Sequence, residues 1–199
     1  MKNLITIGLP SKGRLKEGSV NFFDRNNLKL TINGGERNYF AVVKNFPNIK
    51  IIYLHAKEII QRIGDGTLDM GISGLDLLNE SASNLRQKIE VKKKLDFGSA
   101  NVVVAIPDDW IDVQTVADLE EVSFDFRDKK NTRLRVATKY PNLTREFLFS
   151  KGVTQFQTVG SLGATEAYPF TGSANVITDI SSTGPVSYTH LTLPTKRIV

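Results

Sequence analysis

Short apolar runs alternate with amphipathic stretches along most of this chain. The runs Leu4–Leu9, Asn101–Ile106 and Leu134–Thr138 predict buried strands. The stretches Leu15–Asn26 and Asn142–Lys151 carry apolar residues at helical spacing and predict helices. This alternation indicates an α/β architecture with largely parallel sheets.

The same patterns predict the remaining elements. Further strands are expected at Tyr39–Val43, Ile49–Leu54, Leu68–Ile72, Gln155–Val159 and Asn175–Asp179, and further helices at Lys57–Ile63, Gly74–Leu78, Thr115–Leu119 and Leu162–Tyr168. The tripeptide Phe46-Pro47-Asn48 is expected to turn between two of these strands.

The polar run Glu90–Lys94 leads into Leu95-Asp96-Phe97-Gly98, a short element that predicts a hinge before the next strand. The Asp-Phe-Gly triplet also occurs in protein kinases. No glycine-rich loop, His-Arg-Asp motif or strand lysine accompanies it here, so we reject a kinase.

Composition narrows the function classes only slightly. The chain has 199 residues, of which 40% are hydrophobic and 24% charged, as is ordinary for a globular protein. It has no cysteine, which excludes disulfides and thiolate chemistry, and its two histidines are too few for a histidine-rich metal site. The apolar N-terminal run is too short for a signal peptide and no stretch reaches membrane-spanning length, so we expect a cytoplasmic protein without membrane contact.

The net charge is +5, and the densest basic clusters are Lys92–Lys94 and Lys129–Arg135. Neither cluster is interleaved with aromatic residues or lies in a recognisable nucleic-acid module. We therefore expect no nucleic-acid partner, and we interpret both clusters as solvated surface, with anionic small substrates accounting for part of the excess.

The most informative segment lies at Glu166–Gly184. A short apolar run ends at Asp179, and Ser181, Ser182, Thr183 and Gly184 follow. Hydroxyls and small side chains let donors converge on an anion, while a carboxylate accepts from ribose hydroxyls or holds magnesium. This pattern suits a phosphorylated sugar. An ordinary turn with a Ser/Thr helix cap remains the alternative.

Two further loops carry candidate chemistry. Lys12 and Arg14 flank Gly13 directly after the first predicted strand, where they could reach an anion; a solvated basic turn at a helix start is the alternative. Asp76 lies in the first turn of a predicted helix, where it could bind a ligand or simply complement the helix dipole.

In the second half of the chain, Thr138, Lys139 and Tyr140 follow a predicted strand, and Pro141 opens the next helix. Loops at the carboxyl ends of strands are where α/β proteins usually bind ligands. By itself this segment also fits an ordinary strand-to-helix connection.

Three segments together resemble the ATP phosphoribosyltransferase family, over about residues 1–184. They are Lys12-Gly13-Arg14-Leu15, Ala137-Thr138-Lys139-Tyr140-Pro141-Asn142, and the signature formed by Glu166, Gly172, Ala174, Ile177, Asp179, Ile180, Thr183 and Gly184. The resemblance implies transfer of a phosphoribosyl group from phosphoribosyl pyrophosphate to N1 of ATP, the first step of histidine biosynthesis. One departure is Ser11, inserted between Pro10 and Lys12.

The resemblance also implies the organisation of the protein. It implies two α/β lobes of periplasmic-binding-protein type with a cleft between them, lobe I comprising residues 1–95 with 180–199 returning to it, and lobe II comprising 96–179. Mg²⁺ is the implied cofactor. Implied assemblies are a homo-oligomer or a hetero-oligomer with a regulatory subunit resembling histidyl-tRNA synthetase.

Site residues follow from the same resemblance. Asp179, Lys12 and Arg14 are the candidate catalytic residues. The implied ATP-binding residues are Lys12, Arg14, Lys57, Asp76 and Leu77, and Thr138, Lys139 and Tyr140 are implied to line the second-lobe side of the cleft. Phosphoribosyl pyrophosphate is assigned to Asp179, Ser181, Ser182, Thr183, Gly184 and Glu166.

The family pattern stops after Gly184, where Pro185, Val186 and Ser187 replace its next residues. We predict that the tail from about Pro185 is not native to the gene, that it is poorly ordered or strand-like, and that it weakens phosphoribosyl pyrophosphate binding. Two rival functions remain: a small-molecule binding protein of the same fold and a different phosphoribosyltransferase.

Overall fold

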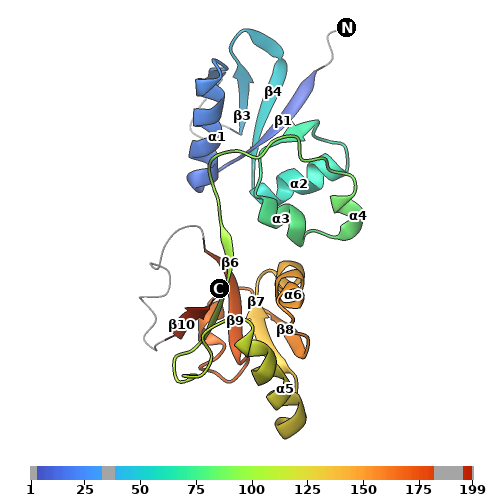
Figure 1. The fold of residues 1–199 in the computed structure, drawn as a ribbon. Coiled ribbons are helices and arrows are strands. Elements are labelled where there is room, and N and C mark those ends of the chain that lie inside the picture. The colour runs from blue at the N-terminus through green and yellow to red at the C-terminus, as the bar shows by residue number, and fades with distance from the viewer. Residues whose placement is uncertain (1–3, 33–38, 182–194, 199) are drawn as a thin grey trace. The chain divides into compact units, whose positions relative to one another are not determined.

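The computed structural model of the chain describes residues 4–32, 39–181 and 195–198 (Figure 1). The chain divides into two compact units, Met1–Gly98 and Ser99–Val199. Each unit contains one five-stranded sheet, in the order β2-β3-β4-β1-β5 in the first and β10-β6-β9-β7-β8 in the second. The predicted α/β class is confirmed, while the cleft between two lobes stays a prediction.

The first unit is a mixed sheet with helices on both faces. Its elements are β1 (Ile5–Pro10), α1 (Gly13–Arg25), β2 (Leu30–Thr31), β3 (Phe40–Val43), β4 (Phe46–Leu54), α2 (Ala56–Gly64), β5 (Met70–Gly71), α3 (Leu75–Glu80) and α4 (Ser83–Arg86). Strand β1 pairs in parallel with β4 and β5, whereas β3 pairs antiparallel with β2 and β4. The prediction of largely parallel sheets was therefore wrong.

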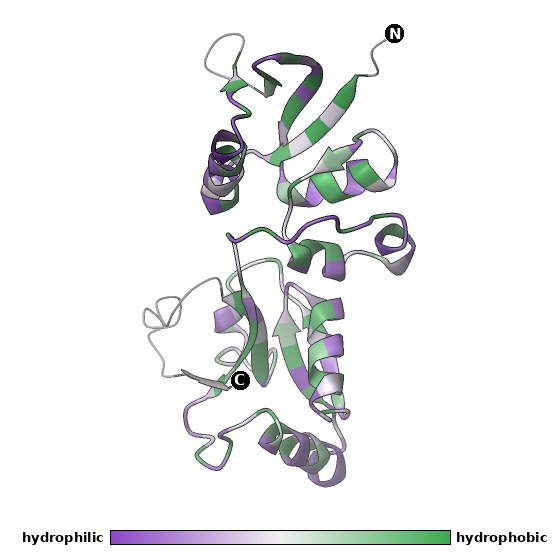
Figure 2. Cartoon of the chain, turned by 45° about the horizontal axis from the view of Figure 1, so that its top comes forward, coloured by the Kyte–Doolittle hydropathy of each residue, from purple (hydrophilic) through white to green (hydrophobic). Residues whose placement is uncertain are grey.

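Alternate residues of β1 explain how both faces of this sheet are covered. Leu9 is fully buried in the cluster that contains Phe23 of α1. Gly8 points the other way, where an added Cβ would lie 2.7 Å from Leu68 Cδ1 and 3.1 Å from Ile59 Cγ2 of α2. Gly8 therefore allows α2 to pack closely on the sheet. Figure 2 shows the matching pattern of apolar strands and striped helices.

The turn between β3 and β4 does not lie at Phe46-Pro47-Asn48, as the sequence predicted. It lies at Lys44–Asn45, where Asn45 adopts a φ of 72° and Val43 pairs with Phe46. Asparagine tolerates this left-handed conformation better than most residues, which explains its place in the turn. Pro47 belongs to β4, next to a shift in register, so its missing N–H removes no regular ladder bond.

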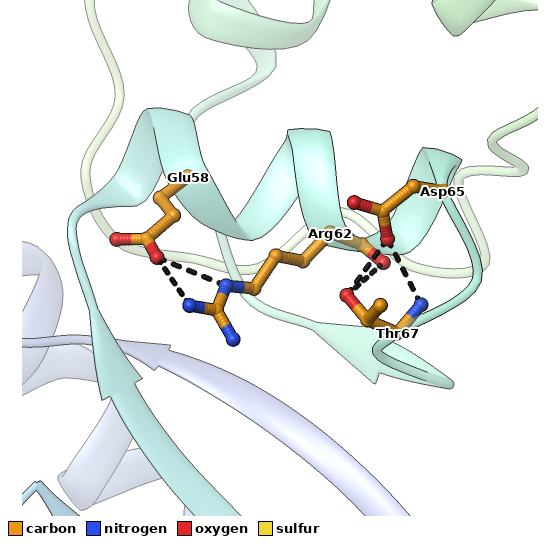
Figure 3. Close-up of polar contacts among 4 residues, drawn as sticks. All are labelled: Glu58, Arg62, Asp65 and Thr67. Carbon is orange, nitrogen blue, oxygen red and sulfur yellow. Dashed lines mark hydrogen bonds and ion pairs between the residues drawn. The ribbon is translucent and has the colours of Figure 1, made fainter.

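Side-chain contacts fix the connection from α2 to β5 (Figure 3). Arg62 forms an ion pair with Glu58 at 2.7 Å, one helical turn earlier. Asp65 Oδ1 accepts hydrogen bonds from the Thr67 N–H at 2.9 Å and the Thr67 hydroxyl at 2.7 Å. These two bonds, the hydroxyl first, lower the pKa of Asp65. The loop thus leaves the helix in one defined direction.

The predicted hinge packs against α1. An added Cβ on Gly18 would lie 2.2 Å from Cδ2 of Phe97, so the Phe97 ring rests directly on the helix backbone. Gly98 has a φ of +72°, and an added Cβ there would meet Leu15 at 2.6 Å. Glycine at position 18 is what admits the aromatic ring of the hinge.

The second unit is also built on a mixed sheet. Its elements are β6 (Asn101–Pro107), α5 (Asp118–Lys130), β7 (Leu134–Thr138), α6 (Pro141–Ser150), β8 (Phe156–Gly160), the 3-10 helix η1 (Thr165–Ala167), β9 (Val176–Ser181) and β10 (Thr195–Ile198). Strands β8, β7 and β9 are mutually parallel, and β6 runs antiparallel to β9 and β10. The main core packs Leu119 of α5 and Leu148 of α6 against Val136 and Val176.

Two predicted helices differ from the structure. In place of Thr115–Leu119, helix α5 begins at Asp118, and Thr115 precedes it: the Asp118 carboxylate accepts the Thr115 N–H at 2.7 Å. In place of Leu162–Tyr168, only the short η1 forms, because Ala164 adopts a φ of 45° and interrupts any regular helix.

The tail contributes one described strand. β10 pairs antiparallel with β6, from Thr195 opposite Pro107 to Ile198 opposite Val104. This pairing lies within the second unit, whereas we had expected residues 180–199 to return to the first lobe. Residues 182–194 lie outside the described part of the chain. Among the described residues, no helix is long and apolar enough to cross a membrane.

Candidate functional site

Three loops gather at one edge of the first sheet. Strands β1, β4 and β5 are parallel and end at Pro10, Leu54 and Gly71. The carboxyl ends of parallel strands share an edge, and ligands of α/β proteins usually bind there. The residues predicted to bind ATP all lie on the loops and helix starts that follow these strands.

Lys12 and Arg14 lie where β1 gives way to α1. Lys12 immediately precedes the helix, Gly13 turns the chain with a φ of 72°, and both basic side chains are exposed. Ser11, the inserted residue, donates its N–H to the Leu54 carbonyl at 2.8 Å. The insertion therefore anchors the basic loop to the neighbouring strand.

Lys57 and Asp76 occupy the first turns of α2 and α3. Lys57 is exposed, and its N–H donates to Nδ1 of His55, which caps the helix. Asp76 is half-buried, and its Oδ1 lies 2.1 Å from the position of a Cβ built on Gly74. The carboxylate thus turns back toward Gly74 at the helix start, and its role in ATP binding stays a prediction.

The loops after β4 and β5 are joined. The Ser73 hydroxyl donates to the Ala56 carbonyl at 2.8 Å, which links the loop before α3 to the start of α2. Leu77, the remaining predicted ATP-binding residue, is half-buried in the first turn of α3. Lys57, Asp76 and Leu77 therefore sit on one connected surface of the first unit.

Asp69 has a structural partner. Its Oδ2 accepts both the N–H and the hydroxyl of Thr6, each at 2.7 Å, which ties the residue before β5 to β1. These bonds, with the backbone bond first, lower the pKa of Asp69 below its ordinary value. The carboxylate holds the edge strand in place.

The second unit has an equivalent edge with a different chemistry. Strands β7, β8 and β9 are parallel and end at Thr138, Gly160 and Ser181. Apart from Ser19 and Ser123, all buried polar side chains among the described residues belong to this region. They are Thr138, Thr144, Ser161, Thr165, Thr178 and Ser181.

The segment Thr138-Lys139-Tyr140 divides into two kinds of residue. Thr138 is only 1% exposed, and its Oγ1 accepts the Tyr140 N–H at 2.9 Å. Its hydroxyl therefore shapes the turn and does not line a surface, which corrects our expectation that Thr138 faces a cleft. Lys139 is exposed and Tyr140 half-buried.

The loop after β8 is also fixed by buried hydroxyls. The Ser161 N–H donates to the Thr138 carbonyl at 2.9 Å, and the Ser161 hydroxyl lies 2.8 Å from that of Thr165. Thr165 opens η1, which carries the half-buried Glu166. Glu166 thus lies on the loop that follows β8, tied to the end of β7.

Asp179 lies within β9, two residues before its end, because pairing with β6 extends the strand to Ser181. It is half-buried, and its Oδ1 accepts the Ile180 N–H at 2.7 Å. Ser181, expected to begin the phosphate loop, is instead the buried last residue of the strand. Ser182, Thr183 and Gly184 lie outside the described residues.

Four hydroxyl residues of this edge were not predicted from the sequence. Thr144 lies on α6, Thr178 on β9, and Ser161 and Thr165 on the β8 loop. Each becomes recognisable only when these elements are packed together. A separate shallow hollow lies at the opposite end of β7 and β8, and it contains none of the predicted site residues. Its lining is Arg127, Asn131, Thr132, Arg133 and Gln155.

A resident metal centre is not evident in the described residues, which contain no group of three or more His, Cys, Asp or Glu side chains. Asp179 is the acidic group on β9. A single carboxylate fits Mg²⁺ when the phosphate oxygens of a substrate and water supply the remaining ligands.

Comparison with known proteins identifies relatives over most of the chain. Residues 55–186 match the family model "HisG: ATP phosphoribosyltransferase". An ATP phosphoribosyltransferase of Mesorhizobium japonicum is 45% identical over 182 residues, which cover 91% of this chain and 78% of that protein. One from Rhodopseudomonas palustris is 46% identical over 184 residues, covering 92% of this chain and 57% of that protein.

A solved structure shares the fold. The structure titled "ATP phosphoribosyl transferase (HisG:HisZ) complex from Thermotoga maritima" aligns with a TM-score of 0.60 and 21% identity, covering 90% of this chain and 75% of that one. At this identity the likeness shows the arrangement of helices and strands alone.

Proposed function

Because this chain belongs to the ATP phosphoribosyltransferase family, we propose that it joins N1 of ATP to C1 of phosphoribosyl pyrophosphate and releases pyrophosphate, the first step of histidine biosynthesis. The 45% identity over 91% of the chain is the observation that carries this proposal. The two strand-end edges then suggest how the substrates are divided.

The first unit suits the triphosphate of ATP. Lys12 and Lys57 are exposed cations on neighbouring strand-end loops, with Arg14 one residue into α1. Long side chains on a solvated edge can follow a flexible polyphosphate, and their attraction is screened by salt. Asp76 and Leu77 then complete the nucleotide-binding surface on α3.

The second unit suits the phosphoribosyl group. Asp179 accepts from the ribose hydroxyls, and residues 182–184, which follow the buried Ser181, hold the 5′-phosphate. Glu166 keeps the β8 loop in position, and Lys139 and Tyr140 flank the same edge. Carbon C1 gains positive charge as pyrophosphate departs, so a fixed carboxylate nearby stabilises the transition state.

The reaction requires no nucleophilic side chain, because N1 of adenine attacks C1 directly. The protein's task is to hold N1 and C1 close together and in line with the departing pyrophosphate. A bound Mg²⁺ would supply positive charge that offsets the charge of the pyrophosphate. Asp179 would contribute a carboxylate ligand to that ion.

The experiment is incubation with ATP, phosphoribosyl pyrophosphate and Mg²⁺, followed by detection of N1-ribosylated ATP. We test the chain as written and a version in which a helix of the family pattern, beginning with Val186→Thr, replaces the tail. Pyrophosphate release that requires both substrates supports the proposal, with the chain as written the weaker of the two. If neither protein forms the product, the proposal is wrong.

The same assay separates the rival functions. Pyrophosphate release with adenine or hypoxanthine in place of ATP would identify a salvage phosphoribosyltransferase. Binding of a small molecule without turnover would identify a binding protein of this fold. Since the Thermotoga maritima relative is titled a HisG:HisZ complex, we also propose that this chain forms a homo-oligomer or pairs with a regulatory subunit of that kind.

A further inference from the structure

Three threonine hydroxyls form a buried hydrogen-bond network in the second unit. Thr138 ends β7, Thr178 lies opposite it on β9, and Thr144 projects from α6 onto both. Thr144 Oγ1 lies 3.0 Å from Thr138 Oγ1 and 2.6 Å from Thr178 Oγ1. Each of the three residues is 1% exposed, so water cannot substitute for these contacts.

The number of protons on each hydroxyl sets the direction of the hydrogen bonds in this network. A threonine hydroxyl carries one proton and accepts through two lone pairs. Thr144 gives its proton to Thr138, so the proton in the shorter contact must come from Thr178. Thr144 is therefore donor and acceptor at once, a combination that serine can reproduce and valine cannot.

The two ends of this hydrogen-bond network lie next to the two proposed contact points for the phosphoribosyl group. Thr138 Oγ1 also accepts the Tyr140 N–H at 2.9 Å, so the hydroxyls set the backbone of the Lys139–Tyr140 turn. At the other end, Thr178 directly precedes Asp179 in β9. The parallel pairing of β7 with β9 reaches its last pair at Thr138 and Thr178, and beyond that pair the two strands separate.

We propose that Thr144 is a positioning residue that couples the Lys139–Tyr140 turn to Asp179. At the point where the β7–β9 ladder ends, its hydroxyl bonds to one side chain of each strand, Thr138 of β7 and Thr178 of β9. The consequence for transfer of the phosphoribosyl group rests on the proposed function. The coupling itself is a property of the folded chain.

A matched set of variants separates the hydroxyl from simple packing. Thr144→Val keeps the shape of threonine and removes both hydrogen bonds, whereas Thr144→Ser keeps the hydroxyl and removes a methyl group. Ser123→Ala is the control: Ser123 is equally buried, and its hydroxyl donates to the Glu120 carbonyl at 2.7 Å within α5. Thr178→Val removes only the hydroxyl that donates to Thr144. This variant replaces Thr144→Val in the experiments if Thr144→Val does not fold.

The first measurement is hydrogen exchange of the Tyr140 amide in the protein without substrates. In Thr144→Val we expect exchange about tenfold faster, since the oxygen that accepts this N–H loses its support. Thr144→Ser and Ser123→Ala should stay within about twofold of the unsubstituted chain. Equal protection in the valine and serine variants would overturn the coupling, whether or not the protein is a transferase.

The second measurement is steady-state kinetics in the version with the family-like helix. Thr144→Val should lower kcat about tenfold and leave KM for ATP unchanged, while Thr144→Ser restores kcat. An equal loss of kcat in Ser123→Ala would mean that the substitutions changed only the stability of the protein, and it would overturn the proposal. If neither the parent protein nor any variant shows turnover, the proposed function is wrong. The hydrogen-exchange result then still shows whether Thr144 couples the turn to β9.

Discussion

The two strand-end edges of this protein are built by opposite means. At the edge of the first sheet the cations are exposed, and the loops are held by bonds to backbone carbonyls, from the Ser11 N–H to Leu54 and from the Ser73 hydroxyl to Ala56. At the edge of the second sheet the polar groups are buried hydroxyls bonded to one another, including Thr138, Thr144 and Thr178. An exposed charged edge adapts to a flexible polyanion, whereas a buried hydroxyl network fixes a geometry.

This difference has a physical basis in solvation. Exposed charges interact through water, so each contributes little and loses strength as salt is added. A buried hydroxyl that loses its partner costs about 1–3 kcal/mol, so such a network tolerates one arrangement. The first edge should therefore govern affinity for ATP, and the second edge should govern turnover.

The largest expected effect is at the second edge. Asp179→Asn replaces a carboxylate by an amide that accepts weakly from ribose hydroxyls and cannot help hold Mg²⁺. We expect kcat to fall about a hundredfold or more with the thermal midpoint little changed. Wild-type turnover, or loss of the folded state by circular dichroism, would remove Asp179 from its proposed role.

A tenfold effect is expected at the first edge. Lys12→Ala should raise KM for ATP about tenfold, and the difference should shrink as salt is raised. Lys16→Ala is the control, because Lys16 lies one turn further along α1 with its Nζ 5.2 Å from the Tyr53 ring centroid. If both variants raise KM equally, the effect is one of general charge and the basic loop has no specific role.

A sign reversal tests the packing of the hinge on α1. Gly18→Ala forces the Phe97 ring away and should destabilise the first unit by about 1–3 kcal/mol in urea unfolding. In a Phe97→Ala background the same substitution should stabilise it by up to about 1 kcal/mol, since alanine favours helix. Equal effects in both backgrounds would show that Phe97 does not rest on Gly18.

The smallest expected effect concerns acid stability of the first unit. Since Thr6 lowers the pKa of Asp69 in the folded state, this contribution is present above the ordinary value of 3.8 and is lost as pH falls through the lower folded pKa. Asp69→Asn should lower the urea midpoint at about pH 7, and this loss should become smaller as the pH falls below the ordinary pKa of 3.8. The exposed Asp24→Asn is the control, and a loss of the same size at every pH would exclude the linkage.

Local patterns predicted most strands and several helices because hydrophobic periodicity is a property of neighbouring residues, but β2 at Leu30–Thr31 was not predicted. The sequence misplaced the β3–β4 turn because Pro47 is a strong turn signal, whereas Asn45, at positive φ, is a weaker one. Helix α5 was foreseen only at its start, since its exposed surface carries mostly charged residues and few apolar positions mark its length.

The candidate site was predicted unevenly for a related reason. Charged loops such as Lys12–Arg14 are visible in the sequence because they follow a strand directly. Thr144 and Thr178 are 34 residues apart and acquire a role only through tertiary packing. Thr138 was misjudged because its place at a strand end was read as exposure, whereas its hydroxyl is turned into the protein.

The most direct test of the division between the two edges is a kinetic comparison of Lys12→Ala and Asp179→Asn, each titrated with both substrates. The division predicts that Lys12→Ala raises KM for ATP about tenfold and leaves KM for phosphoribosyl pyrophosphate within about twofold. It predicts that Asp179→Asn lowers kcat and leaves KM for ATP within about twofold. The division would be contradicted if Lys12→Ala mainly lowered kcat and Asp179→Asn mainly raised KM for ATP. It would also be contradicted if either variant changed the KM values for both substrates equally.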